Sequence, residues 1–314
     1  MKLRIGTRRS PLALWQAHHV TALLKGREAG LEVELVEIVT KGDKILDSPL
    51  AKVGGKGLFV KEIEEQLLSG AVDLAVHSLK DMPAELPEGL VLAAVPPRED
   101  PRDAFVSSRH KRLEDLPKGA KVGTSSLRRA SQLKAWRRDL EIVSIRGNVQ
   151  TRLRKIDTEL DAGILAAAGL KRLELADKIT EFIEPERILP AVGQGVLALE
   201  ARGGDQEVLQ RLAALEDGPT RVAVTAERAF LRRLGGGCQV PIAAHATVSG
   251  KTIDFRGMVG HPDGSRVVEF AEKLEFASLE EVERLGVRGA EAVLSRGAQD
   301  ILAEVLGPGG IPES

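Results

Sequence analysis

Residues 58–78, "LFVKEIEEQLLSGAVDLAVHS", decide how the rest of the chain is interpreted. The first part of this stretch has the apolar spacing of a short helix and ends at Gly70. The second part is a short, mostly apolar run that is typical of a buried strand. A helix that leads directly into a buried strand predicts strand–helix–strand units, and therefore an α/β domain with a largely parallel sheet.

The residues before this stretch continue the same alternation. Residues 2–6 predict a short strand, and residues 32–40 alternate between apolar and polar side chains as a strand does. The helix between them has clear end signals: Ser10 is a natural N-cap, Pro11 suits the first helical position, and Gly30 ends the run.

The residues after it predict a second α/β domain. Residues 96–103, "PPREDPRD", form a proline-rich and charged break, which we interpret as a crossing between domains. The strand–helix alternation then resumes without any visible sequence repeat, and residues 162–170 are predicted as a strand. Residues 188–204 predict a second crossing, and residues 219–234 predict a helix.

From Val240 the pattern changes to antiparallel strands followed by one long helix, roughly 278–306, which predicts a small α+β domain. We therefore expect two α/β domains with crossing connections and a third, smaller domain. The predicted boundaries are 1–97 with 194–216 for the first domain, 98–193 with 217–236 for the second, and 237–314 for the third.

The composition limits the classes of partner. The 314 residues include 45 Lys and Arg against 46 Asp and Glu, a net charge of −1, so no nucleic-acid or membrane partner is expected. A single cysteine excludes an internal disulfide and a cysteine-based metal cage, and we expect no metal. The first residues resemble neither a signal peptide nor a membrane span, so a cytoplasmic location is expected.

Three segments place arginine where a predicted strand ends and a helix begins. They are "GTRRSP" (6–11), "GTSSLRR" (123–129) and "IRGNVQTR" (145–152). Arginine at the positive end of a helix is unfavourable unless an anion lies between them, and such strand ends meet at the ligand crevice of an open α/β sheet. The residues concerned are Arg8, Arg9, Arg128, Arg129, Arg146 and Arg152. We expect them to converge on a polyanion, either carboxylate or phosphate.

Two further residues have two interpretations each. Asp81, in "HSLKDMP" (77–83), follows the buried strand beside Lys80, where an ionised carboxylate could act as an acid, a base or a stabiliser of cations. Its spacing alone, however, favours an ordinary turn residue. Cys238, the single cysteine, follows three glycines. It is either an inert buried thiol or an exposed nucleophile or attachment point.

Taken together, the motifs resemble one family over essentially the whole chain, the hydroxymethylbilane synthases, also called porphobilinogen deaminases. The matching stretches are "RIGTRRSPLALWQA", "VGGKGLFVKE", "AVHSLKDMP", "VGTSSLRR", "IRGNVQTRL", "AAAGLKRL", "LPAVGQG" and "AERAFLRRLGGGCQVPI". The resemblance implies two domains similar to type II periplasmic binding proteins, with the cofactor cysteine at the boundary to the third domain.

The resemblance also implies an activity. Enzymes of this family carry a dipyrromethane cofactor on a cysteine, add four porphobilinogen units to it head to tail, and release the linear tetrapyrrole hydroxymethylbilane, a precursor of haem. Each addition expels ammonia and leaves a cation, which an ionised carboxylate would stabilise. The implied protein is a monomeric transferase whose partner is porphobilinogen.

The site residues that the resemblance implies fall into four groups. Asp81 is the catalytic residue. The cofactor is attached through Cys238 and bound by Ser78, Lys80, Thr124, Ser126, Arg128, Arg129, Arg146 and Gly147. The substrate is bound by Arg8, Ser10, Gln16, Arg152, Arg172 and Gln194. Lys52, Lys56 and Phe59 belong to a lid over residues 43–57 and just after it.

Two rival functions remain open at this point. A non-catalytic, two-lobed anion-binding protein would explain the arginines but neither Cys238 nor Asp81. A hydrolase with a cysteine nucleophile would need a histidine base near Cys238, and no histidine lies close to it in the sequence. Both rivals predict that Cys238 is unmodified in the purified protein.

Overall fold

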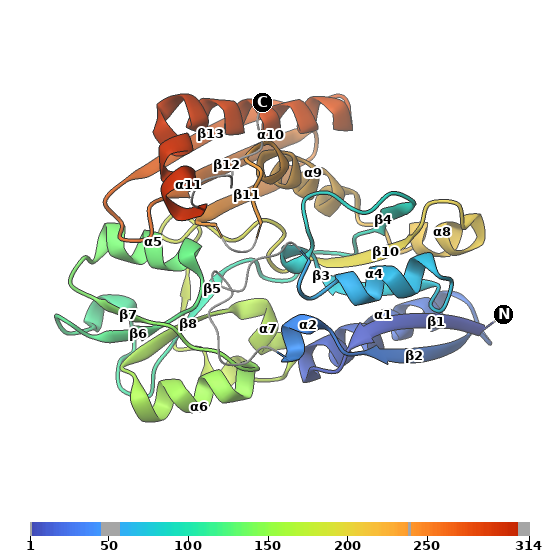
Figure 1. The fold of residues 1–314 in the computed structure, drawn as a ribbon, viewed down its shortest axis with the longest axis horizontal. Helices are drawn as coiled ribbons and strands as arrows, with labels where there is room; N and C mark the ends of the chain where they lie inside the picture. The colour runs from blue at the N-terminus through green and yellow to red at the C-terminus, as the bar shows by residue number, and fades with distance from the viewer. Residues whose placement is uncertain (1, 45–56, 238–239, 307–314) are drawn as a thin grey trace.

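A computed structural model describes residues 2–44, 57–237 and 240–306, and its strands form three sheets (Figure 1). The first sheet has the strand order β2-β1-β3-β10-β4. Its strands are β1 (Lys2–Arg8), β2 (Glu32–Ile38), β3 (Leu74–Ser78), β4 (Leu90–Ala94) and β10 (Leu197–Arg202). Its helices are α1 (Pro11–Arg27), α2 (Lys41–Lys44), α4 (Lys61–Leu68), η1 (Leu79–Asp81) and α8 (Gln206–Ala213).

The second sheet has the strand order β7-β6-β8-β5-β9. Its strands are β5 (Asp103–Val106), β6 (Lys121–Gly123), β7 (Glu141–Val143), β8 (Ala162–Ala166) and β9 (Glu181–Ile183). Its helices are η2 (Leu113–Asp115), α5 (Leu127–Trp136), α6 (Val149–Glu159), α7 (Ala167–Arg172) and η3 (Ala176–Lys178).

The two sheets share one topology. In the first sheet β1 pairs in parallel with β2 and β3, while β10 runs antiparallel to both β3 and β4. In the second sheet β6 pairs in parallel with β7 and β8, while β5 runs antiparallel to both β8 and β9. The antiparallel strands β10 and β5 each come directly after one of the crossings. Each sheet therefore gains one strand from chain that has just crossed from the other domain. The prediction of two α/β domains with crossing connections is confirmed.

The third sheet is antiparallel, in the order β11-β12-β13, and forms the upper part of Figure 1. Its strands are β11 (Ile242–Ser249), β12 (Thr252–Gly260) and β13 (Val267–Glu275), and its helices are α10 (Leu279–Val293), η4 (Leu294–Ala298) and α11 (Gln299–Leu306). Helix α9 (Gly218–Arg233) packs here as well, because Phe230 shares a core with Phe255 at a ring separation of 5.7 Å. The domain boundaries remain a prediction, and this packing argues for moving 217–236 to the third domain.

Two predicted elements are wrong. The run 162–170 is a strand only as far as Ala166 and continues as α7 from Ala167, because alanine-rich sequence suits a helix as well as a buried strand. The long helix predicted over 278–306 breaks at Gly297, whose φ of 99° is not helical.

The two crossings run side by side. The amide of Glu99 donates to the carbonyl of Gly195 at 3.1 Å. Gly195 has a φ of +86°, and a Cβ there would lie 2.3 Å from the Glu99 carbonyl oxygen, so only glycine fits this approach. The crossings therefore fix the two α/β sheets against each other, and the cleft described below lies between those sheets.

Candidate active site

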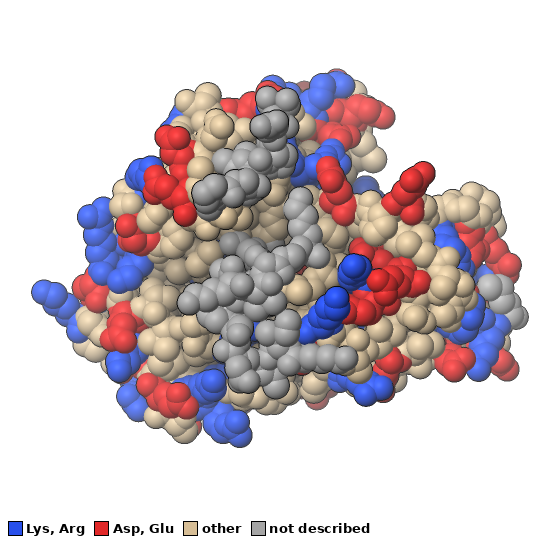
Figure 2. Space-filling model, in the orientation of Figure 1, with Lys and Arg blue, Asp and Glu red and all other residues tan. Residues whose placement is uncertain are grey.

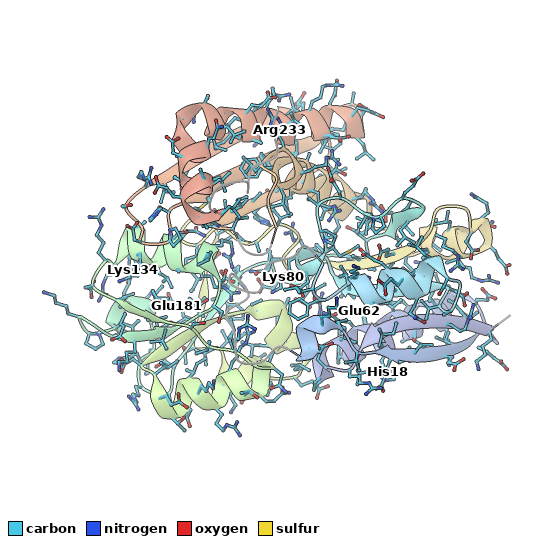
Figure 3. The ribbon with its side chains drawn as sticks, in the orientation of Figure 1. His18, Glu62, Lys80, Lys134, Glu181 and Arg233 are labelled. Atoms are coloured by element: carbon cyan, nitrogen blue, oxygen red, sulfur yellow. The ribbon has the colours of Figure 1, made fainter. Side chains whose placement is uncertain are left out.

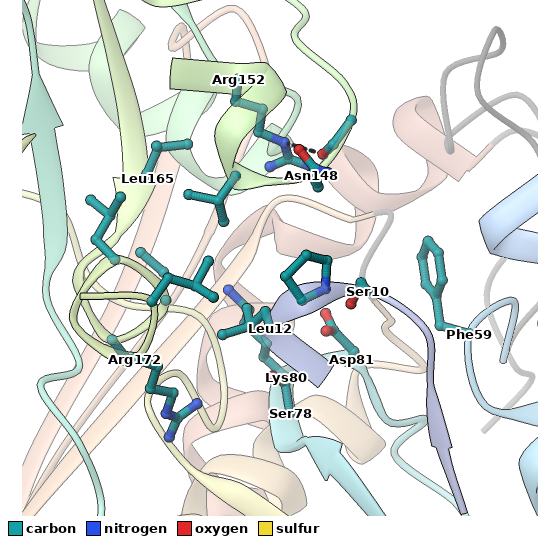
Figure 4. Close-up of a pocket in the computed structure, with 18 of the residues that line it drawn as sticks. Ser10, Leu12, Phe59, Ser78, Lys80, Asp81, Asn148, Arg152, Leu165 and Arg172 are labelled. Atoms are coloured by element: carbon teal, nitrogen blue, oxygen red, sulfur yellow. Dashed lines mark hydrogen bonds between the residues drawn. The ribbon is translucent and has the colours of Figure 1, made fainter. Parts of the chain in front are cut away.

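A cleft of about 460 Å³ lies between the first and second sheets, where strands and helices of both contribute side chains (Figure 4). From the first sheet it is lined by the end of β1, the start of α1 and the segment from Ser78 to Asp81. From the second it is lined by the turn before α6 and by the junction of β8 with α7. These are the carboxyl ends of parallel strands, the expected place for a ligand in open α/β sheets.

The cleft is strongly cationic. Among the described residues that line it, six are Lys or Arg and two are Asp. The cations are Arg8, Lys80, Arg129, Arg146, Arg152 and Arg172, and the acids are Asp43 and Asp81. The visible surface in Figure 2, in contrast, mixes blue and red side chains without a large region of one sign. Four of the six arginines that were predicted to converge, Arg8, Arg129, Arg146 and Arg152, line this cleft. Arg9 instead pairs with Glu37 at 3.4 Å, and Arg128 lies outside the lining.

The three predicted helix starts are capped by their own side chains. Ser10 accepts a hydrogen bond from the Ala13 amide at 3.3 Å, and Ser126 accepts one from the Arg129 amide at 3.4 Å. The third cap is Asn148, which accepts from the Thr151 amide at 2.8 Å. These hydroxyl and amide groups therefore hold the turns in shape, while the arginine side chains supply the charge.

Asp103 organises the second-sheet arginines from a fully buried position at the start of β5. Its Oδ1 accepts from Arg129 Nη2 at 2.7 Å, and its Oδ2 lies 2.8 Å from Arg128 Nη1. Gln194 Nε2 donates to the same carboxylate at 2.9 Å. Burial alone would raise the pKa of Asp103, but the two guanidinium groups outweigh it and hold the pKa well below its usual range.

Some of the predicted site residues around Asp103 line the cleft, and others lie outside its lining. Arg129 lines the cleft, whereas Arg128 and Gln194, 3% and 1% exposed, lie outside its lining. Thr124 and Ser126 also lie outside that lining; Thr124 is buried and accepts from the Ser126 amide at 3.2 Å. The sequence interpretation missed Asp103, although a carboxylate within an otherwise apolar buried strand is a signal, because it must be paired there.

Lys80 and Asp81 both line the cleft, and Figure 3 shows Lys80 near the centre of the molecule. Burial lowers the pKa of Lys80 to about 8, the nearby Asp81 carboxylate opposes this shift, and Arg129 adds to it. The Ser78 hydroxyl next to them accepts from Gln16 Nε2 at 2.8 Å. Gln16 lines a smaller pocket of about 50 Å³ that also reaches Arg8, Ser78 and Asp81.

The remaining predicted cations reach the cleft from the second domain. Arg152 Nε donates to the Gly147 carbonyl at 2.9 Å, and Gly147 holds a φ of +106° at the cleft wall. Arg172 Nη2 donates to the Gly195 carbonyl at 2.7 Å, and burial lowers the pKa of Arg172 to about 10. Arg172 thus links the cleft to the crossing segments.

Arg8 lies at the opposite wall, between a carboxylate and an aromatic ring. Its guanidinium forms an ion pair with Asp43, and its Cζ lies 4.4 Å from the centre of the Phe59 ring. Phe59 therefore lines the cleft, and its role as a lid residue stays a prediction. Three further predicted residues, Cys238, Lys52 and Lys56, lie outside the residues that the structure describes.

The chain is similar to proteins of one family along nearly all of its length. A family model described as "Porphobilinogen deaminase, dipyromethane cofactor binding domain" matches residues 3–210, and one described as "Porphobilinogen deaminase, C-terminal domain" matches residues 222–295. A porphobilinogen deaminase of Syntrophotalea carbinolica is 58% identical over 302 residues, covering 96% of this chain and 95% of its own. One of Brevibacillus brevis is 55% identical, covering 97% and 98%.

Among solved structures, the methionine-binding protein MetQ is 15% identical over 68% of this chain and 89% of its own, with a TM-score of 0.45.

Proposed function

The chain belongs to the porphobilinogen deaminase family, and we propose which of its side chains perform the reaction of that family. The reaction is that of hydroxymethylbilane synthase: four porphobilinogen molecules condense with loss of ammonia into a linear tetrapyrrole on a dipyrromethane cofactor. The observation that supports the assignment of residues best is the excess of cations in the cleft, six against two acids among its described lining residues.

The cleft chemistry fits the cofactor and its product. Each porphobilinogen unit carries an acetate and a propionate, so the growing chain multiplies carboxylates, and bidentate arginine forks match such groups. We propose that Lys80, Arg129 and Arg146 bind the cofactor, together with Ser78 and Gly147, while Arg8, Ser10, Arg152 and Arg172 bind the incoming substrate. When bound, the dipyrromethane supplies the terminal pyrrole carbon to which the first unit is joined.

Five predicted ligands act indirectly in this proposal. Arg128 and Gln194 share the Asp103 carboxylate with Arg129, so they hold Arg129 in place. Thr124 and Ser126 shape the start of α5, and Gln16 orients the Ser78 hydroxyl. These contacts support a role in positioning the cleft side chains rather than direct contact with a ligand.

Asp81 is the proposed catalytic residue. It lines both the main cleft and the smaller pocket, beside Lys80, and no other acid has this double position in the described part of the cleft. Loss of ammonia from the aminomethyl group creates positive charge, and a preorganised carboxylate stabilises such charge most effectively in a site closed from water. The same carboxylate can accept the proton that the attacked pyrrole carbon releases.

We keep Cys238, which directly follows three glycines in the sequence, as the proposed attachment point of the cofactor. This proposal is supported by the sequence, because Cys238 is the single thiol of the chain and lies in the matching stretch "GGGCQVPI". Lys52, Lys56 and Phe59 stay the proposed lid residues. The ion pairs of Arg129 with Asp103 and of Arg8 with Asp43 support the fit, since each fixes the position of an arginine that lines the cleft.

We also propose that the protein works as a monomer in the cytoplasm, without nucleic acid. The near-neutral net charge of −1 and the mixed surface charge of Figure 2 support this, since nucleic-acid binding needs a basic patch. None of the described helices has the length and apolar character that crossing a membrane requires. Light scattering during size-exclusion chromatography measures the oligomeric state directly.

One experiment separates the synthase from a two-lobed anion binder. Purified protein is incubated with porphobilinogen, and both ammonia and tetrapyrrole are quantified over time. The synthase releases four ammonia molecules for every tetrapyrrole it forms. A protein that depletes free porphobilinogen without releasing ammonia is a binder, and that result would contradict the assignment.

A further inference from the structure

Asp43 and Arg8 form an ion pair at the wall of the cleft. Arg8 Nε donates to Asp43 Oδ1 at 3.1 Å, and Arg8 Nη2 donates to the same oxygen. Both residues line the cleft, and the two side chains are 24% and 23% exposed. The pair is therefore part of the surface that a ligand meets.

Asp43 is itself held by a second residue. Its Oδ2 accepts from the Thr40 hydroxyl at 2.8 Å and from the Thr40 amide at 3.2 Å. Thr40 is fully buried at the end of the first sheet, so it provides a fixed anchor. Burial raises the pKa of Asp43, but Arg8 and Thr40 outweigh that effect and lower it, so the carboxylate stays ionised at neutral pH.

Phe59 contacts one face of the Arg8 guanidinium group. The Arg8 guanidinium lies over its ring, and the ring in turn rests against Gly42, where a Cβ would lie only 2.3 Å from the ring. Glycine at position 42 thus lets the ring approach closely enough to stack beneath Arg8. A cation held over an aromatic face in this way has a fixed plane as well as a fixed position.

This geometry leaves a defined part of Arg8 for a ligand. Asp43 takes the Nε–Nη2 edge of the guanidinium, so the Nη1–Nη2 edge is the one that can receive a further carboxylate in a forked manner. We propose that Asp43 is a positioning residue, which aims this second edge of Arg8 at a carboxylate of porphobilinogen or of the growing chain. The proposal rests on the function given above and assigns to Asp43 no contact with the substrate.

A matched ion pair elsewhere in the chain provides the control. Arg137 and Asp139 form a similar pair at 2.7 Å with side chains 22% and 24% exposed, and neither residue lines the cleft. The substitutions Asp43→Asn and Asp139→Asn therefore each remove one ion-paired carboxylate of similar exposure. Only the first removes a group that orients a cleft cation.

The test measures kcat and KM for porphobilinogen in the wild-type holoenzyme and in both variants. Asp43→Asn is expected to raise KM about tenfold, the loss of one charge-assisted hydrogen bond, and to change kcat less than about threefold. Asp139→Asn is expected to leave both constants unchanged. Asp43→Glu, which keeps the carboxylate, is expected to recover part of the loss in KM.

A double variant excludes a purely structural effect. In an Arg8→Lys background there is no fork to orient, so adding Asp43→Asn is expected to raise KM by less than about twofold. Should Asp43→Asn fail to fold or to carry its cofactor mass, Thr40→Val, which loosens Asp43 but keeps both charges, is expected to raise KM about threefold.

The result that overturns the proposal is an unchanged or lower KM in Asp43→Asn, or in Thr40→Val when the first variant does not fold. A full additional KM increase in the Arg8→Lys background would overturn it as well. Wild-type enzyme without ammonia release would instead contradict the proposed function, so the two failures are distinguishable.

Discussion

Arg98 and Glu227 form a buried ion pair, 2.6 Å from Nη1 to Oε1, at the point where both crossings meet the third sheet. Arg98 belongs to the first crossing, and the amide of Gly193 in the second crossing donates to Glu227 at 2.7 Å. The amide of Ala246 in β11 donates to the same carboxylate at 2.9 Å. Burial alone would raise the pKa of Glu227, but Arg98 and His245 hold it at about 2.

Replacing Glu227 by alanine should therefore destabilise the whole chain. It leaves Arg98 and two amides buried without their acceptor, which we expect to cost about 3–5 kcal/mol in the free energy of unfolding. Urea denaturation measures the loss. Glu283→Ala, which breaks an exposed pair with Arg232, should cost less than about 1 kcal/mol and serves as the control. Equal losses in the two variants would contradict this role of Glu227.

Asp81→Asn should separate cofactor retention from catalysis. The amide keeps the size of the side chain but neither stabilises positive charge nor accepts a proton. We expect kcat to fall by roughly 10²–10⁴ while the cofactor mass stays in place, as measured by ammonia release and intact mass. Asp157→Asn, on the exposed side of α6, should behave like wild type. An Asp81→Asn variant with wild-type turnover would show that the carboxylate has no catalytic role.

Arg152→Ala should stall chain growth rather than abolish binding. Arg152 lies in the cleft lining, whereas Arg154, two residues later on α6, is exposed and outside that lining. Removing one of several carboxylate-binding forks should weaken the binding of a chain of one particular length. Mass spectrometry after a short incubation should show one intermediate accumulating in Arg152→Ala and wild-type proportions in Arg154→Ala. Identical intermediate patterns in the two variants would exclude a specific role for Arg152.

Glu64 should make stability depend on pH. Burial and the nearby Glu200 carboxylate raise its pKa from 4.5 to about 7. Between these values the folded state holds a proton that the unfolded state has lost, so the free energy of unfolding falls as pH rises through this window.

Glu64→Gln, which cannot ionise, should match wild type near pH 5 and exceed its free energy of unfolding by about 1–2 kcal/mol above pH 7. The exposed neighbour Glu65→Gln should show no such pH-dependent gain. If Glu64→Gln has the same free energy of unfolding as wild type above pH 7, then ionisation of Glu64 does not destabilise the folded protein. That result would contradict a raised pKa for Glu64.

Much of the fold follows from local signals in the sequence. Ser10 and Pro11 start α1 as predicted, because capping is decided by neighbouring residues. The crossings and the convergence of arginines could be predicted too, since strand ends in α/β sheets meet at one edge. The helix that begins at Ala167 was missed, because an apolar alanine-rich run carries no period that distinguishes a strand from a helix. The break at Gly297 was missed, because a single glycine inside a helical pattern is compatible with an unbroken helix.

The partners of the cleft arginines could not be predicted. Asp103 lies 26 residues before Arg129 in the sequence, and Asp43 lies 35 residues after Arg8, so only the folded chain brings each pair together. Arg128 likewise resembles a ligand-binding residue in the sequence but is turned toward Asp103, outside the cleft lining. Which arginine faces a ligand depends on such long-range pairs, and these are set by tertiary packing.

The most direct measurement is the intact mass of the denatured protein before and after porphobilinogen is added. We predict an excess over the polypeptide mass equal to two linked pyrrole units, mapped to the peptide that contains Cys238, and further increments of one unit after addition. A protein that shows the bare polypeptide mass and gains nothing from porphobilinogen would contradict the assignment as a synthase.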